Sequence, residues 1–534
     1  MYIPFWTRLR AREWFYLLIS LLFLWFESLV NLITYLLPRV VISHCTSSTK
    51  WVFRYVLRSP DAASAKDFPP ASAGLSPHVN WENLCLLQSA QSIHEMCAVF
   101  GFTATSHLTS TKDEYLLTLH RISRDIPRER NGEIVYFHHG LLMCSDIWCT
   151  MLQEHQNLPF VLYDLGYDVW LGNNRGNKYS NKHLKLRTGT NAYWDFSIDE
   201  FAMHDIPSMI NYILTFAKME YQHIAKPAIR PSSQLTYIGF SQGSAQAFAS
   251  LSLNPDLNFK VKRLIAISPA TTPRGLNNYI VDSLMKASPK IMYLLFGLRI
   301  LLPSAQFWQN IMYPPLYCKV IDVANRFLFG WKSDNIDVIQ KLSSYKHLYS
   351  PTSVKCVVHW LQIISNSNFQ MFYDYNEYYL KRLFYPVEYP LPSILIPINL
   401  IYGTHDSLVD IDIMTEQLGN GRNLQVFLMD GYEHLENIWG VDVATKIFPY
   451  IIDVLKNDRR GGLLKGKDTL QGLLGDVIEE GTANSTLYSR NQRGDENREG
   501  HRKSPGGEFH YAEVSLTGLS VLDVNRRLSH SFQN

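Results

Sequence analysis

Two kinds of apolar segment alternate between Trp81 and Leu455. Short runs bounded by Gly, Asn or Asp predict strands over residues 115–122, 133–140, 167–173, 235–240, 261–269, 398–406 and 424–434. Longer runs with helical character separate them. Strands that alternate with helices are typical of a mostly parallel sheet with helices on both faces. The pattern therefore predicts an α/β domain over residues 81–456.

The alternation stops between Pro269 and about Pro392. This stretch is aromatic and helical in pattern, for example in YLLFGLRILLPSAQFWQNIMY. We interpret residues 271–393 as a helical cap inserted into the sheet domain. Beyond Lys456 the sequence becomes polar and charged, which predicts a disordered tail over residues 457–534.

The N-terminus is unusual because residues 14–42 are nearly all apolar and follow three arginines. A buried core helix and a cleaved signal peptide are two interpretations, but the run is long and lacks a clear A-x-A-like cleavage site. We therefore expect residues 1–42 to be a retained membrane anchor. It either spans the bilayer, with the arginines favouring a cytosolic N-terminus, or inserts as a hairpin from one side. Residues 43–80, rich in Pro, Ala and Ser toward their end, predict a linker.

The amino-acid composition mainly excludes certain partners and kinds of site. The 534 residues are 46% hydrophobic and 18% charged, and the net charge of +2 gives no signal for a nucleic-acid partner. The seven cysteines are scattered and form no CxxC pair, so neither a disulfide framework nor a structural zinc site is expected. We also expect no metal or organic cofactor. The oligomeric state stays open.

The segment LTYIGFSQGSAQAFASL contains the pattern G-x-S-x-G around Ser241. By chance this pattern occurs in roughly one to two of every ten chains of this length. Here a predicted strand precedes it and a helix of small residues follows it, as in the nucleophile elbow of α/β-hydrolases. Gly239 and Gly243 flank the serine, where a strained and crowded backbone excludes larger side chains. Ser241 is thus the candidate nucleophile.

A serine hydroxyl needs a base and an orienting acid, which α/β-hydrolases carry in the order nucleophile, acid, histidine. Asp406 ends a buried-looking strand and is preferred as the acid over Asp410 and Asp412, which fall in the following segment. His434 lies in the loop DGYEHLENIW, between a strand and a final helix. Of the 18 histidines, only His434 lies downstream of Asp406 and before the polar tail.

The tetrahedral intermediate of ester hydrolysis needs two backbone N–H donors. Gln242, directly after the nucleophile, is expected to supply one. The second is expected after an early strand, where the chain reads FHHGLLMCSDIW. Gly140 lets the backbone turn close to the substrate, so the Leu141 N–H is the candidate. A simple strand-ending turn at this point is the alternative.

Several segments resemble, in chain order, the acid lipases, a family that includes gastric and lysosomal lipases and fungal steryl ester hydrolases. They are STKDEYLLTLHRI, HHGLLMCSDIW, WLGNNRGNKYSNKH, YWDFSIDEFAMHDIPSMINYI, GFSQG, SPTSVKCVVHWLQ, YGTHDSLVD and YEHLENIWGVD. The similarity extends over residues 81–452. Phe240 stands where the family often has His, and His138 stands where it often has Gln. Neither departure removes a catalytic group.

The resemblance implies an α/β-hydrolase that cleaves long-chain lipid esters, steryl esters first and triacylglycerols second. The apolar N-terminus is similar to that of the fungal sterol esterase branch, which implies a location on lipid droplets or the endoplasmic reticulum. Two alternatives stay open: another ester or thioester hydrolase on the same scaffold, and a non-catalytic protein that tethers membranes. We expect Asn173, Arg175 and Asn177 to form a structural network beside the elbow.

Overall fold

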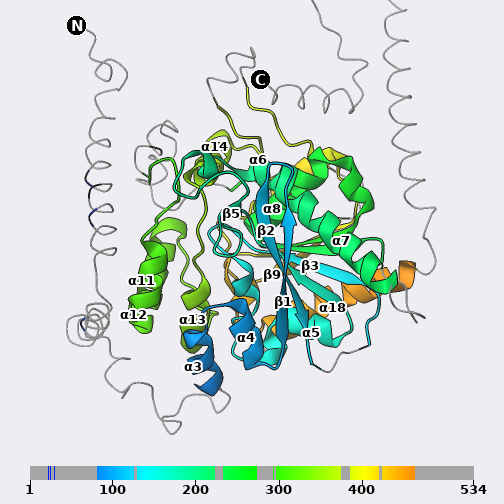
Figure 1. Cartoon of the computed structure of the whole chain (residues 1–534), viewed down its shortest axis with the longest axis horizontal. Coiled ribbons are helices and arrows are strands. Elements are labelled where there is room, and N and C mark those ends of the chain that lie inside the picture. The colour runs from blue at the N-terminus through cyan, green and yellow to red at the C-terminus, as the bar shows by residue number, and fades with distance from the viewer. Residues whose placement is uncertain are drawn as a thin grey trace, which may run out of the picture. The chain divides into compact units, whose positions relative to one another are not determined.

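The computed structural model describes residues 81–125, 129–222, 232–273, 296–374, 385–419 and 424–462, and the isolated positions 22, 25, 29, 48 and 293 (Figure 1). The predicted anchor and linker therefore lie outside the continuous described segments, as does the predicted tail beyond residue 462. Among the described residues, no helix is both long enough and apolar enough to cross a membrane.

The described strands form one nine-stranded sheet in the order β1–β2–β4–β3–β6–β7–β8–β9, with β5 paired to β2. They are β1 (Thr103–Ser110), β2 (Tyr115–Ser123), β3 (Ile134–His138), β4 (Asp168–Leu171), β5 (Lys182–His183), β6 (Leu235–Phe240), β7 (Val261–Ile267), β8 (Ile398–Gly403) and β9 (Leu424–Met429). Every pair along the order from β4 to β9 is parallel, whereas β2 is antiparallel to its neighbours. Loops after β3, β6, β8 and β9 therefore lie at one edge of the sheet, where α/β enzymes bind ligands.

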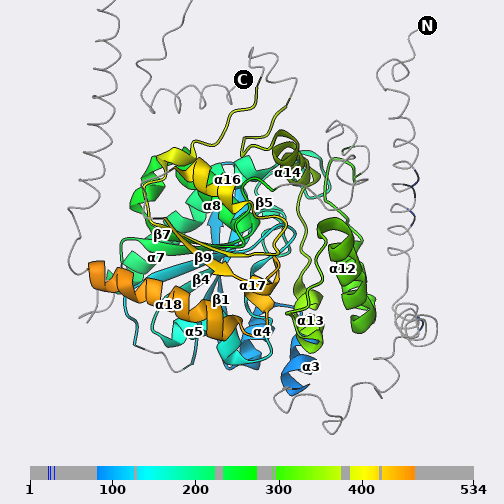
Figure 2. The ribbon, with the colours of Figure 1, turned by 180° about the vertical axis from the view of Figure 1, so that it is seen from behind.

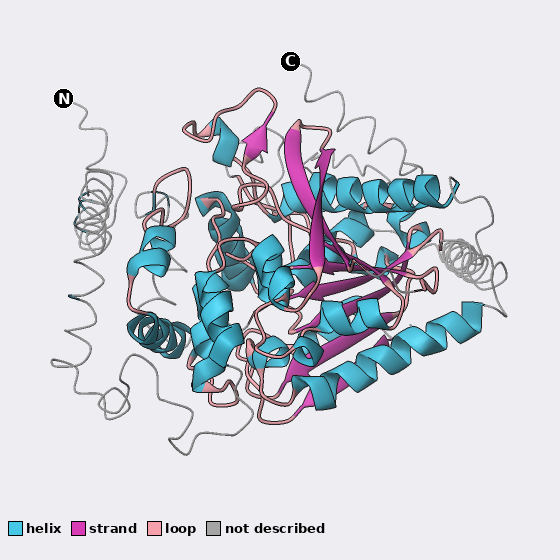
Figure 3. Cartoon of the chain, turned by 60° about the horizontal axis from the view of Figure 1, so that its bottom comes forward, coloured by secondary structure: helices cyan, strands magenta, loops and turns pink. Residues whose placement is uncertain are grey.

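Helices cover both faces of this sheet, which separates two hydrophobic cores (Figure 3). The covering helices are α3 (Trp81–Ser89), α4 (Ile93–Val99), α5 (Leu158–Asp164), α6 (Ile198–Glu200), α7 (Ile206–Gln222), α8 (Gln242–Leu253), α16 (Ile411–Leu418), α17 (Glu436–Trp439) and α18 (Val443–Gly462). Alternate side chains of a strand point to opposite faces. In β6, Leu235 and Tyr237 accordingly join the core with α7 and α8, whereas Ile238 and Phe240 join the core with α5 and α18.

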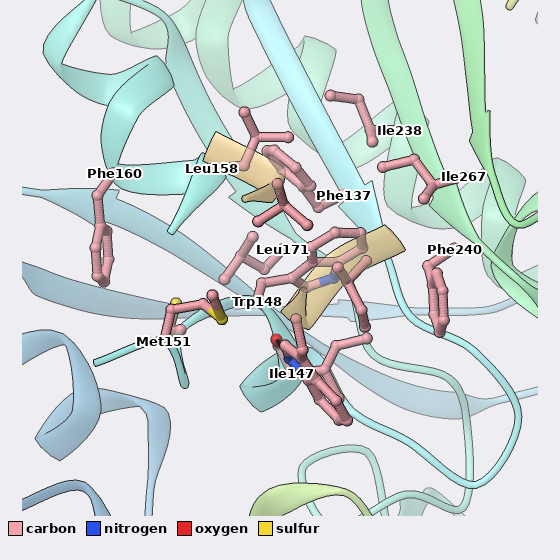
Figure 4. Packing of buried hydrophobic residues seen from close by; sticks show 14 of the residues in the cluster. Phe137, Ile147, Trp148, Met151, Leu158, Phe160, Leu171, Ile238, Phe240 and Ile267 are labelled. Atoms are coloured by element: carbon pink, nitrogen blue, oxygen red, sulfur yellow. Dashed lines mark hydrogen bonds between the residues drawn. The ribbon is translucent and has the colours of Figure 1, made fainter. Parts of the chain in front are cut away.

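Side chains of β3 and β6 pack closely against the loop after β3, next to the sheet edge where the loops after β3, β6, β8 and β9 lie (Figure 4). Figure 4 shows Phe137 of β3, Ile238 and Phe240 of β6, and the indole of Trp148 from the 3-10 helix η2 (Ser145–Trp148). The ring centroid of Trp148 lies 4.9 Å from that of Phe137 and 6.4 Å from that of Phe240. The segment that follows β3 is therefore packed against the strand that carries the candidate nucleophile.

Between β7 and β8, the chain forms the helices α11 (Ala305–Ile311), α12 (Pro314–Phe329), α13 (Val338–Ser344) and α14 (Val354–Asn366). These helices lie within residues 271–393, the stretch predicted to be an inserted helical cap. Figures 1 and 2 both place α12 and α13 side by side. Gly330 ends α12 in the left-handed conformation, at φ 79°, which suits glycine.

The α/β fold and all seven predicted strands are confirmed: β6 has the predicted bounds, β2 extends one residue further, and the other five are shorter than the sequence indicated. Strand β8 ends at Gly403 and β9 at Met429, so the last polar residues of those predicted runs belong to loops. The exposed strand β1 was missed, because Ala104 is its one buried residue and it lacks an apolar alternation. The predicted end of the domain at Lys456 was also too early, since α18 continues to Gly462.

Candidate active site

A sharp turn between β6 and α8 holds Ser241. Its backbone angles, φ 52° and ψ −121°, lie in a region that residues other than glycine rarely adopt. The approach of the chain is so close that a Cβ on Gly243 would lie 2.6 Å from the carbonyl oxygens of both His138 and His139. The backbone of the elbow therefore packs tightly against the end of β3.

Hydrogen bonds join Ser241, His434 and Asp406. His434 Nε2 lies 2.7 Å from Ser241 Oγ, and His434 Nδ1 lies 2.7 Å from Asp406 Oδ2. The tautomer that satisfies both contacts donates its Nδ1–H to the carboxylate and accepts the hydroxyl proton at Nε2. All three residues are buried, with 9%, 3% and 5% of their surfaces exposed in the order named. This arrangement can deprotonate the serine hydroxyl as it attacks.

The loops that carry Asp406 and His434 follow the neighbouring strands β8 and β9 and are tied together. The His405 N–H donates to the Tyr432 carbonyl at 3.0 Å. The Leu408 N–H donates to Asp406 Oδ1 at 3.0 Å, which leaves Oδ2 to the histidine. The carboxylate is therefore held in position before any substrate binds.

Ser268, which sequence reasoning missed, fixes the backbone of His434. It directly follows β7 and has a φ of 46°, which is strained for a residue other than glycine. Its hydroxyl donates to the His434 carbonyl at 2.9 Å and accepts from Asn437 Nδ2 at 2.8 Å. The only sequence signal was its position after a strand of the parallel sheet.

The segment around Leu141 lies directly beside the nucleophile. A Cβ on Gly140 would lie 3.2 Å from Ser241 Cβ. Leu142 has a φ of 59°, and its carbonyl accepts a hydrogen bond from the Ser350 N–H at 2.6 Å. Among the described residues, neither the Leu141 nor the Gln242 N–H donates to a protein acceptor. The structure therefore brings both predicted donors to the edge where Ser241 lies.

His139 orients the peptide between Gly140 and Leu141. Its Nδ1–H donates to the Gly140 carbonyl at 2.8 Å, while its Nε2 accepts from the Asn174 N–H at 3.2 Å. In a trans peptide the carbonyl and the following N–H point in opposite directions. Burial lowers the pKa of His139 to about 4, so the neutral tautomer persists at neutral pH.

Two tryptophans of the predicted cap contact residues of the candidate site. Trp331 stacks on His434, with ring centroids 5.1 Å apart and an interplanar angle of 8°. Trp360 of α14 donates its Nε1–H to Gln242 Oε1 at 2.6 Å, and the Cys356 thiol contacts the same oxygen at 3.3 Å. Sequence reasoning missed both roles, although Cys356 and Trp360 fall within a segment that resembles the acid lipases.

Asn173, Arg175 and Asn177 form a buried network, as expected. Asn177 Nδ2 donates to Asn173 Oδ1 at 2.9 Å, and Arg175 pairs with the carboxylates of Asp205 and Asp113. None of the three bonds to Ser241, His434 or Asp406 within the described part of the chain. Their role is to support the loop after β4 next to the site.

The described residues hold six cysteines, all as free thiols. Within the same residues, no group of three or more His, Cys, Asp and Glu side chains is arranged to hold a metal ion.

Comparison with known proteins agrees with this geometry. A family model described as a partial α/β-hydrolase lipase region matches residues 93–152, and the α/β hydrolase fold model matches residues 133–441. A probable lipase of Schizosaccharomyces pombe is 44% identical over 70% of this chain and 82% of its own length. The lysosomal acid lipase/cholesteryl ester hydrolase of Macaca fascicularis is 30% identical over 69% of this chain and 92% of its own. The chain belongs to the acid lipase family of α/β-hydrolases.

The gastric triacylglycerol lipase of Rattus norvegicus is 29% identical over 70% of this chain and 93% of its own length. The α/β hydrolase fold match contains all three residues of the hydrogen-bonded set, as well as Leu141 and Gln242. Membership of this family makes the chain a hydrolase that acts on esters.

The close approach at Gly243 leads to a prediction. Gly243→Ala should destabilise the protein by on the order of 3 kcal/mol and lower esterase activity at least tenfold, because backbone carbonyls cannot move aside cheaply. Gly189→Ala is the matched control, since a Cβ at Gly189 has nothing within 4 Å. Urea unfolding and hydrolysis of a soluble ester measure both effects. Equal behaviour of the two variants would contradict the account of the elbow.

Buried histidines make stability depend on pH. Burial lowers the pKa of His120 to about 3 and those of His139 and His347 to about 4. In the unfolded chain these groups take up protons below about pH 6.5, whereas the folded chain resists until about pH 4. The free energy of unfolding should therefore fall as the pH drops through this window, by on the order of 2 kcal/mol per histidine at pH 5.

Asp199 and Asp205 act in the opposite direction, because burial raises their pKa values. A single variant separates the contribution of His347 to the pH dependence of stability from those of the aspartates. His347→Gln, which can still donate to the Leu87 carbonyl, should lose less stability than the wild type between pH 7.5 and pH 5. Urea midpoints at the two pH values measure this difference. An identical loss in both proteins would show that His347 does not contribute.

Proposed function

We propose that the protein hydrolyses long-chain lipid esters, steryl esters in preference to triacylglycerols, by a Ser–His–Asp mechanism at a membrane or lipid-droplet surface. The observation that carries the mechanism is the position of the His434 ring. One ring nitrogen contacts the Ser241 hydroxyl and the other contacts the Asp406 carboxylate, each at 2.7 Å.

In this mechanism Ser241 Oγ attacks the ester carbonyl carbon while His434 Nε2 takes the hydroxyl proton. Asp406 keeps the imidazole in the required tautomer and stabilises its positive charge. The tetrahedral intermediate collapses, and His434 gives its proton to the departing alcohol oxygen. Water then attacks the acyl-enzyme with the same base, which releases the fatty acid and restores Ser241.

The Leu141 and Gln242 N–H groups would hold the negative oxygen of both intermediates. Donors fixed in advance stabilise developing charge without a reorganisation cost. His139 fixes the peptide that carries the Leu141 N–H, and Trp360 fixes the Gln242 side chain. Both donors thus belong to residues that are already held in place.

The preference for a large apolar substrate rests on the cap and on the relatives. A hydrophobic cluster formed by Leu301, Val354, Val358, Leu361 and Ile364 packs against Leu142, beside the oxyanion segment. The relatives include a lysosomal acid lipase/cholesteryl ester hydrolase and a gastric triacylglycerol lipase. The steryl ester comes first because the apolar N-terminus resembles the fungal sterol esterase branch.

The surface association rests on residues 1–42, whose apolar run is long enough for a bilayer. Deletion of these residues should release the protein from the membrane and lipid-droplet fractions. Hydrolysis of a soluble short-chain ester by the truncated chain should stay within about twofold of the full chain, because the hydrogen-bonded site lies elsewhere. Cell fractionation with immunodetection measures the release. Continued co-fractionation with membranes would contradict the assigned anchor.

Substitution of the nucleophile tests the chemistry. Ser241→Ala should lower hydrolysis of emulsified steryl ester and triacylglycerol by at least about a thousandfold. Ser252→Ala on α8, whose hydroxyl donates to the Ala249 carbonyl of the same helix, is the matched control and should stay active. Similar hydrolysis by the wild type and Ser241→Ala would refute the mechanism. Faster hydrolysis of triacylglycerol than of steryl ester by the wild type would retain the mechanism and reverse the substrate order.

A further inference from the structure

Two aromatic rings, those of Phe329 and Trp331, stack in sequence on the imidazole of His434. The Phe329 and Trp331 ring centroids are 4.3 Å apart with an interplanar angle of 23°. The Trp331 and His434 rings are 5.1 Å apart and almost parallel, at 8°. Phe329 ends α12 of the cap, so the stack begins on an element far from β9 in the sequence.

The Trp331 indole is held on several sides. It is 4% exposed, and its Nε1–H donates to Ser407 Oγ at 3.0 Å. The Ser407 hydroxyl in turn donates to the Phe329 carbonyl at 2.9 Å. Because Ser407 directly follows Asp406, the indole links the loop of the acid to the ring of the base.

The backbone next to Trp331 is also fixed to the histidine loop. The N–H groups of Lys332 and Ser333 donate to the Glu433 carboxylate at 2.9 and 2.7 Å. The Asn335 N–H donates to Glu436 Oε1 at 2.8 Å. These bonds lie on both sides of His434 in the sequence, so the cap segment and the histidine loop form one rigid contact.

The stack bears on the proposed reaction through the charge of the His434 ring. In the proposed mechanism, His434 gains a positive charge on the way to each of the two transition states, when its Nε2 takes a proton. A cation within about 6 Å of an indole face is attracted by the negative π surface, more strongly when water is excluded. An interaction that is stronger in the transition state than in the ground state accelerates the reaction.

We propose that Trp331 is a positioning residue for catalysis, which fixes the plane of the His434 ring and stabilises its protonated form. This inference rests on the proposed function, since it assumes that His434 is the general base. The flat indole surface, almost parallel to the imidazole, opposes tilting of the His434 ring out of the plane in which it makes its two nitrogen contacts.

Other charged groups near His434 must be kept constant in the test. Asp406 from the loop after β8 contacts His434 itself, and Glu433 and Glu436 lie on the histidine loop. On the cap segment, Asp334 interacts electrostatically with Glu433, and the Lys332 N–H donates to the Glu433 carboxylate. Burial raises the pKa of Glu433. Substitutions at Trp331 leave all of these groups in place, so a change in the pH profile reports on the imidazole and its new neighbour.

The experiment compares Trp331→Phe and Trp331→Leu with the wild type in the full chain, using p-nitrophenyl butyrate as a soluble substrate. Trp331→Leu should lower kcat about tenfold with KM within about twofold, because the indole is buried and acts through the His434 ring that it contacts. The acid limb of its kcat/KM profile should move to lower pH, since the protonated imidazole has lost a stabilising face. Trp331→Phe, which keeps a smaller aromatic face, should recover most of kcat and most of the shift.

Two controls separate this effect from a general loss of structure. Phe327→Leu on α12, where Phe327 is 50% exposed, should leave kcat and the pH profile unchanged. Ser407→Ala frees the indole N–H but keeps the ring, so its kcat should fall less than that of Trp331→Leu. Urea midpoints of all variants show how much stability each has lost.

Equal losses of kcat in Trp331→Phe and Trp331→Leu, or an acid limb that does not move, would overturn the role proposed for Trp331. If Trp331→Leu does not fold, the pH profile of Trp331→Phe decides, and an unchanged acid limb there overturns the proposal. Ser241→Ala is measured in parallel. An active Ser241→Ala would refute the proposed function itself, whereas an inactive one beside a fully active Trp331→Leu would refute only this inference.

Discussion

The strained backbone at Ser241 is the constraint on which the rest of the site depends. A φ of 52° at a serine is unfavourable, and it persists because β6, α8 and the end of β3 enclose the turn. The parallel register places Gly239 opposite His138, so the oxyanion segment follows β3 at the same edge as the elbow. The loops after β8 and β9 then reach that edge with the acid and the base.

The predicted cap contacts several parts of the candidate active site. It contacts the base through Trp331, the oxyanion segment through Ser350 and the second oxyanion residue through Trp360. These contacts come from three separate stretches of one insertion. The position of the cap and the geometry of the reacting groups are therefore coupled, and a movement of the cap that admitted a bulky ester would also move the groups that process it.

The sequence predicted the groups whose positions follow from local pattern and chain order. Strand β6 was predicted with its observed bounds because its apolar run, its glycines and its helix are contiguous. His434 and Asp406 followed from the order of the triad and from strand ends. Trp331 and Ser268 could not be predicted, because their roles arise from contacts with His434, which is more than 100 residues away in the chain. Strand β1 was missed for a different reason, namely that an exposed strand needs no apolar alternation.

The central claim is that Ser241 is a nucleophile activated by His434 and Asp406. A fluorophosphonate probe followed by peptide mass spectrometry tests it most directly, because the probe forms a stable bond with an activated serine. We expect one adduct, on the peptide that contains Ser241, at neutral pH. We expect this adduct to be lost in His434→Ala but kept in His405→Ala. An adduct on another serine would contradict the account. So would ester hydrolysis by protein that has been fully treated with the probe and carries no adduct at Ser241.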